Sequence, residues 1–193
     1  MINAKNIARK LWSIWQLDGC SISVWWNIFF INLIRKNTRP KVQLQFISTR
    51  YCAVTVDKSA QLVLNGPFIL GHKQLKNSRL ETRLSLGKNA KLVVNDYFTV
   101  YYGSDIRIYP NAILSLYGGF CSNGVRIICR NQITIGKDCA IAPEVIIRDS
   151  DEHQLLSSEY EISTTSKNNL RSPTIILDKT PRSVKISYFL PLK

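Results

Sequence analysis

Four copies of one eleven-residue pattern constrain the fold of this chain more than any other feature. Each copy has two apolar residues flanking one other residue, then a three-residue turn, a small residue and a second apolar stretch. The copies are VTVDKSAQLVL, LSLGKNAKLVV, IRIYPNAILSL and ITIGKDCAIAP, which begin at Val54, Leu84, Ile106 and Ile133. Apolar residues that alternate along short segments predict strands with one buried face, and the turn formers between them predict tight corners.

This pattern favours a β-solenoid over an antiparallel sandwich. The small residue of each copy is Ala60, Ala90, Ala112 or Cys139, which suits a corner whose inside has little room. A sandwich would also have short strands with regular turns, but no Asn-Gly hairpin joins neighbouring copies. We therefore predict strands that wind into stacked coils, each of which buries its apolar face against the next.

The stretch from Ile135 to Glu152 gives the clearest coil. It divides into the three groups IGKDCA, IAPEVI and IRDSDE, each led by an isoleucine, at Ile135, Ile141 and Ile147. Hexapeptide periodicity of this kind is typical of a parallel β-helix. Three groups of six residues would fill one three-sided coil of 18 residues.

A polar string, DSDEH, follows this coil and ends at His153, one of two histidines in the chain. In an extended chain Asp149, Asp151 and His153 share one face, and Glu152 lies on the other. Carboxylates and imidazole also bind metals, but no second histidine is near, so we expect no metal site. A plain surface loop is a further alternative. The other histidine, His72, is expected in a loop between coils, without a functional role.

The segment ITIGKDCAIAPEVIIRDSDEHQL resembles the hexapeptide-repeat acyltransferases, especially those that O-acetylate capsular or lipopolysaccharide sugars. The upstream segments GSDIRIYPNAILSLYGG and RIICRNQITIG are also similar to that family, and the resemblance covers roughly residues 40–156. It implies an all-β fold, a left-handed parallel β-helix forming a three-sided solenoid, assembled as a homotrimer. It also implies acetyl transfer from acetyl-CoA to a sugar hydroxyl in surface-polysaccharide biosynthesis.

The resemblance gives His153 the role of the catalytic base, which takes the proton of the sugar hydroxyl as that oxygen attacks the thioester. General-base catalysis contributes roughly 10²–10⁴-fold in rate, and histidine suits it because its ordinary pKa lies near neutrality. Asp149 or Asp151 is expected to orient the imidazole or to contact the acceptor sugar, and Glu152 is a further candidate for that contact. Alternatively, the aspartates cap the turn that ends the coil.

The N-terminal segment is apolar and basic. All four tryptophans lie within the first 26 residues, and the apolar run from Ile22 to Ile34 is followed by Arg35, Lys36 and Arg39. With three polar interruptions this run is too short to span a membrane, which takes about 20 apolar residues. It is a poor secretory signal as well. Two interpretations stay open: a cap over the end of the core, or an interfacial segment on anionic lipid.

Charge and cysteine content narrow the partners and the compartment. The net charge is +13, and residues 1–50 hold eight Lys or Arg but one acid. Such a basic chain favours anionic partners, although we expect no nucleic acid, because the basic and aromatic clusters fall in an apolar stretch. Five cysteines without a Cys-x-x-Cys pair argue against disulfides and zinc. We expect a cytoplasmic protein, peripheral to the inner face of the membrane if the N-terminal segment binds lipid.

We expect four parts: an N-terminal apolar and basic segment (1–45), a β-helix domain (46–150), an acceptor-site loop (151–172) and an irregular C-terminal tail (173–193). The tail begins with PTIILDK, similar to a return to the helix, but ends in TPRSVKISYFLPLK without a hexapeptide. The resemblance implies further coils that form much of the acetyl-CoA groove. We therefore expect a truncated or degenerate O-acetyltransferase with weak or absent activity. The alternative is a non-catalytic β-helix that binds a partner, a sugar or further copies of itself.

Overall fold

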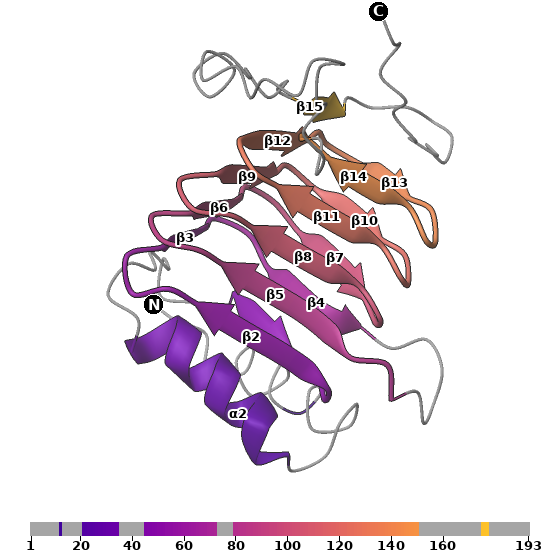
Figure 1. Ribbon diagram of the computed structural model, residues 1–193. Coiled ribbons are helices and arrows are strands. Elements are labelled where there is room, and N and C mark those ends of the chain that lie inside the picture. The colour runs from indigo at the N-terminus through magenta and orange to yellow at the C-terminus, as the bar shows by residue number, and fades with distance from the viewer. Residues whose placement is uncertain (1–11, 13–20, 35–44, 73–78, 151–174, 178–193) are drawn as a thin grey trace, which may run out of the picture.

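The structure is a computed structural model that describes residues 12, 21–34, 45–72, 79–150 and 175–177. This part of the chain is mostly β, with three parallel sheets and few helices (Figure 1). The helix α2 (Ile22–Phe29) continues into a short π-helical segment, η1 (Phe30–Ile34). The predicted all-β class with an N-terminal helical segment is thus observed.

The strands form three five-stranded sheets. The first sheet consists of β1 (Phe46–Ser48), β4 (Phe68–His72), β7 (Phe98–Tyr101), β10 (Gly119–Cys121) and β13 (Cys139–Ile141). The second consists of β2 (Cys52–Val56), β5 (Thr82–Leu86), β8 (Asp105–Ile108), β11 (Arg126–Cys129) and β14 (Ile146–Arg148). The third consists of β3 (Gln61–Leu64), β6 (Lys91–Val94), β9 (Ile113–Leu116), β12 (Gln132–Ile135) and β15 (Ile175–Leu177).

The chain visits the three sheets in rotation, so each strand pairs with the strand three places further along the chain. Figure 1 shows the resulting stack, which rises from β2 to β14 with little drift between successive levels. Parallel pairing of this kind needs a crossover, and here the other two sheets supply it. The arrangement is consistent with the predicted parallel β-solenoid.

The core consists of inward side chains that stack in register from coil to coil. Leu62, Leu92, Leu114 and Ile133 occupy equivalent positions on four successive strands of the third sheet, and all four are fully buried. Burying one such side chain stabilises a fold by about 1.5–3 kcal/mol. The apolar alternation noted in the sequence therefore builds a continuous core through the stack.

The corners follow the predicted chemistry. Ala60, Ala90 and Ala112 are fully buried inside the corners between the second and third sheets. Asn89 and Asn111 precede two of these alanines with φ angles of 54° and 63°, in the left-handed region that Asn tolerates. The prediction of small residues inside the corners, with turn formers beside them, is confirmed.

The register predicted for the fourth copy of the repeat is wrong. Val54, Leu84 and Ile106 do lie in register on the second sheet, but the next residue in that row is Ile127. Ile133 lies in the third sheet instead. The corner between β11 and β12 has two residues, whereas the three earlier corners at this edge have four. The fourth copy therefore repeats the pattern at a different corner.

The coil predicted from residue 135 onward is observed as far as the structure describes it. Ile135, Ile141 and Ile147 lie in β12, β13 and β14, one on each sheet, and all three are buried. Three groups of six residues thus correspond to three sides.

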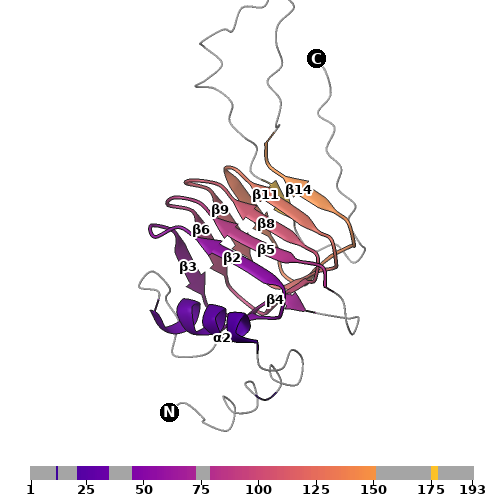
Figure 2. The ribbon, with the colours of Figure 1, turned by 60° about the horizontal axis from the view of Figure 1, so that its bottom comes forward.

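The N-terminal segment covers the first coil, as Figures 1 and 2 show for α2. Ile31 is buried as part of the main core, and Val24 and Ile28 pack against Ile47 on β1. Asn32 is buried and pairs with the edge of β1: its side-chain nitrogen donates to Phe46 O, and its side-chain oxygen accepts from the Gln45 and Phe46 amides. Within the described residues, no helix has the length and apolarity to cross a membrane.

Candidate functional site

The largest departure from the regular stack lies between β14 and β15. Two residues link β11 to β12 at the edge between the second and third sheets, whereas residues 149–174 separate β14 from β15 at the same edge. The strand β15 pairs with β12 in parallel, so the chain rejoins the third sheet one level above β12. The predicted base His153, together with Asp151 and Glu152, lies in this insertion but outside the described residues.

Asp149 is the predicted site residue that the structure describes, and it lies inside the corner at which the insertion begins. Its side chain is 1% exposed. One carboxylate oxygen accepts the amide N–H of Arg130 at 2.7 Å, and the other accepts that of Asn131 at 2.8 Å. Of the roles proposed from the sequence for Asp149, this geometry corresponds to capping the turn, with the carboxylate turned away from solvent.

The hydrogen-bond ladder explains why a carboxylate is needed there. In earlier coils the first amide after each strand of the second sheet donates to the backbone carbonyl of the coil above, as Gly87 does to Ile108 and Tyr109 to Cys129. Arg130 is the next donor in this row, and its acceptor is the side chain of Asp149. The carboxylate thus replaces a backbone carbonyl where the regular coil gives way to the insertion.

The buried thiols of Cys129, which lies beside this corner, and of Cys121 on β10 are not activated nucleophiles. Burial, reinforced by the negative charge of Asp149 at 3.8 Å, raises the pKa of the Cys129 thiol to about 12. Burial also raises the pKa of Cys121. Both thiols are therefore protonated at neutral pH, and the thiolate is the nucleophilic form. No cluster of three or more potential metal ligands occurs among the residues that the structure describes.

The outer face of the second sheet is basic beside the insertion. Arg126 and Arg148 are exposed on β11 and β14, and neither has an ion pair within the described part of the chain. Arg130 lies over the ring of Tyr109, with the guanidinium carbon 4.3 Å from the ring centre. Arg107, one level lower, is paired with Asp105 at 2.5 Å. The root of the insertion therefore presents positive charge.

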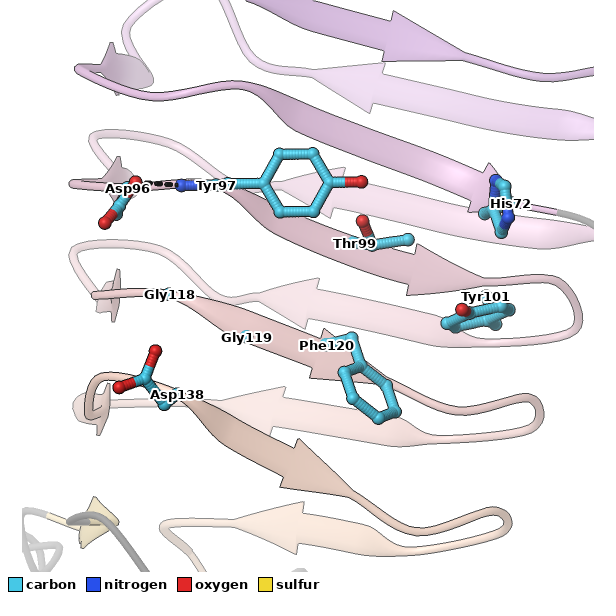
Figure 3. Close-up of a pocket in the computed structure, with 9 residues that line it drawn as sticks. All are labelled: His72, Asp96, Tyr97, Thr99, Tyr101, Gly118, Gly119, Phe120 and Asp138. Atoms are coloured by element: carbon cyan, nitrogen blue, oxygen red, sulfur yellow. Dashed lines mark hydrogen bonds between the residues drawn. The ribbon is translucent and has the colours of Figure 1, made fainter.

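A pocket of about 320 Å³ lies elsewhere, on the outer face of the first sheet (Figure 3). Its lining comes from four successive levels of the stack and from the edge where the third sheet leads into the first. The lining residues are His72, Asp96, Tyr97, Thr99, Tyr101, Gly118, Gly119, Phe120 and Asp138.

The pocket has an aromatic side and an acidic end. His72, Tyr101 and Phe120 form an edge-to-face series, with ring centres 5.0 Å and 5.9 Å apart. Figure 3 shows the two carboxylates, Asp96 and Asp138, at the opposite end from His72. The sequence reasoning missed this site and expected His72 in a loop, whereas it is the last residue of β4. The available signal was the series of outward aromatic residues at equivalent levels, which becomes visible only once the register is known.

No protein-family model, curated protein or solved structure matches this chain. Its function must therefore be inferred from its own residues and their arrangement.

Proposed function

We propose that this protein is an O-acetyltransferase that moves an acetyl group from acetyl-CoA to a sugar hydroxyl in surface-polysaccharide biosynthesis. The observation that carries the proposal is the insertion at residues 149–174, at one corner of a three-sheet parallel stack. The sequence around it resembles the hexapeptide-repeat acyltransferases, in which the base follows such a coil. The same proposal includes the finer features of that family, a left-handed β-helix and a homotrimer.

The proposed reaction needs one base and one positioned thioester. The imidazole of His153 takes the proton of the sugar hydroxyl while the hydroxyl oxygen attacks the thioester carbonyl. The tetrahedral intermediate then collapses, the C–S bond breaks and the coenzyme A sulfur leaves, taking up a proton. Asp151 would orient the imidazole or accept hydrogen bonds from the sugar, and Glu152 is a further candidate for the sugar contact. Asp149 would act indirectly, by fixing the corner from which this segment begins.

The charge of the described surface supports an anionic donor. Coenzyme A carries several phosphate charges. Exposed Arg148 immediately precedes the insertion, and exposed Arg126 lies at the start of the adjacent strand β11. Arginine suits phosphate because its planar guanidinium donates two parallel hydrogen bonds.

A second candidate function is a non-catalytic solenoid that binds a saccharide or a protein. The observation in its favour is the pocket on the first sheet, whose lining within the described part of the chain includes no residue of the insertion. A binding protein would retain this pocket without any need for a thioester.

Acetyl transfer is tested by incubating the full chain with acetyl-CoA and a panel of sugars, followed by thiol release and by the mass of the acetylated product. We expect His153→Ala to lower the rate by at least 100-fold. The neighbouring change Gln154→Ala is the control and should retain the rate. A His153→Ala variant as active as Gln154→Ala would overturn the proposal. A wild-type protein without turnover on any acceptor would agree with the weak or absent activity expected of a degenerate member and would favour the binding function.

We also propose that the helical segment contacts an anionic lipid surface. Ile22, Trp26, Phe29 and Leu33 are all exposed, and their spacing of three or four residues places them on one helix face, away from the core. The net charge of +7 in residues 1–50 suits acidic headgroups. Sedimentation with phosphatidylserine-containing and neutral vesicles tests this. Trp26→Ser should reduce binding to the acidic vesicles, whereas Leu80→Ser, an equally exposed position elsewhere, should not. Equal losses in both variants would contradict the idea.

A further inference from the structure

We infer that the pocket on the outer face of the first sheet binds a saccharide that is neutral or carries an amino or acetamido group. This inference goes beyond acetyl transfer, because none of the described residues that line the pocket belongs to the insertion that holds His153. It assigns to the protein a carbohydrate site that requires neither acetyl-CoA nor catalysis.

The aromatic side chains supply the first part of the argument. Tyr97 and Phe120 are 51% and 40% exposed. Their aromatic rings are therefore accessible to a ligand on this outer face. A sugar ring has one apolar face of C–H groups, which packs on an aromatic ring, while its hydroxyls stay at the edge. Aromatic residues with a few convergent polar groups are typical of small-ligand sites.

The acidic end supplies the chemistry for hydroxyl groups. One oxygen of Asp96 accepts the Tyr97 amide at 2.7 Å, and the other has no partner among the described residues. Asp138 lies across Gly118 from it (Figure 3). Carboxylates only accept hydrogen bonds at neutral pH, so they select ligands rich in O–H or N–H donors. Two carboxylates at one end of the pocket also repel an acidic sugar.

The glycine between these carboxylates keeps the space open. A Cβ atom placed on Gly118 would lie 3.6 Å from the Asp96 side chain and 3.9 Å from the Tyr97 carbonyl oxygen. Any larger side chain there would extend between the two carboxylates and fill this end of the pocket. The backbone of Gly118 also has a φ of 142°, which other residues rarely adopt.

Thr99 supplies an independent indication of a ligand. Three buried side-chain hydroxyls lack a partner within the described residues, and only the hydroxyl of Thr99 belongs to the pocket. Thr99 is 4% exposed and lies on β7 between Ile69 and Phe120 on the adjacent strands, which offer it no polar group. Figure 3 shows the half-exposed ring of Tyr97 reaching over β7 toward this hydroxyl. A buried polar group without a partner costs free energy, and a sugar hydroxyl admitted beside Tyr97 would satisfy it.

The binding test uses the full chain without acetyl-CoA. Pull-downs on cellulose, starch, chitin and alginate beads are compared at low salt and at about 1 M salt, where the screening length falls to about 3 Å. The net charge of +13 will bind the acidic alginate at low salt, and that binding should disappear at high salt. Binding in the pocket should persist at high salt on at least one neutral or acetamido polysaccharide. Calorimetry with oligosaccharides of the retained polymer then gives the affinity.

Variants distinguish the pocket from the rest of the surface. Tyr97→Ala and Phe120→Ala should each lower the affinity at least tenfold, and neither removes a core side chain. Tyr117→Ala is the matched control, because Tyr117 is also 40% exposed and lies outside the pocket lining. It should change the affinity less than twofold.

The isosteric change Thr99→Val gives a readout that a purely structural role would not produce. Loss of an unpaired buried hydroxyl should raise the melting temperature of the free protein, while the affinity for the saccharide falls several-fold. The inference is overturned if no neutral or acetamido polysaccharide is retained at high salt. It is also overturned if Tyr117→Ala weakens binding as much as Phe120→Ala. No step of this binding test involves acetyl-CoA, so its failure leaves the acetyl-transfer proposal unaffected. Likewise, a failed acetyl-transfer assay leaves the proposed saccharide site unaffected.

Discussion

The corner cap formed by Asp149 leads to a sharp prediction about stability. Replacement of Asp149 by alanine removes the acceptor of two backbone amides, those of Arg130 and Asn131. Replacement by asparagine keeps the shape but leaves one acceptor, because the side-chain amide nitrogen would then face one of the two N–H groups. The two variants therefore separate the hydrogen bonds from the packing.

The structure gives the size of the effect. A hydrogen bond to a charged group contributes about 1.5–3 kcal/mol, and the amides at this corner are only partly buried, so water replaces some of the loss. We expect Asp149→Ala to cost about 3 kcal/mol and Asp149→Asn about 2 kcal/mol. The control is Asp105→Asn on the same sheet, which disturbs a solvent-exposed ion pair with Arg107. Such surface pairs contribute about 0–1 kcal/mol.

Hydrogen exchange measured by mass spectrometry is the appropriate assay. The last coil of a stack can open without unfolding the others, so a global unfolding curve would average over unequal parts. In peptides that cover β11 and β12, a loss of 3 kcal/mol corresponds to roughly 150-fold faster exchange. If both Asp149 variants exchange within threefold of Asp105→Asn, the carboxylate is not the cap, and its alternative role as a sugar contact becomes the better explanation.

Three further changes test other parts of the structure. Asn32→Ala leaves both Phe46 backbone groups without their partner, so we expect a loss of about 2–4 kcal/mol in urea unfolding and aggregation through the uncovered edge of β1. Cys129 should react with a thiol reagent at pH 8 roughly 1,000-fold more slowly than a thiol of pKa 9.0, since its pKa is about 12; labelling as fast as that of the less buried Cys52 would contradict this. Gly119→Ala would place a Cβ atom against a backbone oxygen of the next coil, so we expect a large drop in melting temperature, and an unchanged value would show that the strands can separate.

The sequence predicted the strands and corners because stacking imposes the same requirement at every level. The positions of Leu62, Leu92 and Leu114 must all be apolar, and the corner positions must all be small, so the pattern repeats and can be recognised. The register of the fourth copy could not be predicted in the same way. The fourth copy keeps the local pattern, but its corner lies between β12 and β13, and the pattern alone does not show on which side of the stack it falls.

The pocket could not be predicted because its residues follow no short motif. Thr99 and Phe120 are direct neighbours on adjacent strands, although 21 positions separate them in the chain. His72 and Tyr101 are adjacent for the same reason. Pairing across coils depends on the exact length of every corner, which varies from two to four residues at one edge, and on bulges such as the register shift between Leu70 and His72 in β4. Outward residues also escape the packing rule that makes inward residues recognisable.

Asp149 shows how a polar motif can mislead in a solenoid. The string DSDEH suggests a row of functional groups, but its first member is buried and replaces a carbonyl group of the ladder. That replacement is needed because regular pairing stops there: the amide of Arg130 would otherwise lack an acceptor, and the chain could not leave the stack at this corner without cost. A buried carboxylate at the last regular corner therefore indicates where an insertion begins, and catalytic residues should be sought after it. In this chain the proposed base His153 and the proposed sugar contacts Asp151 and Glu152 follow this corner, so the loss of turnover proposed for them is distinct from the loss of structure expected for Asp149.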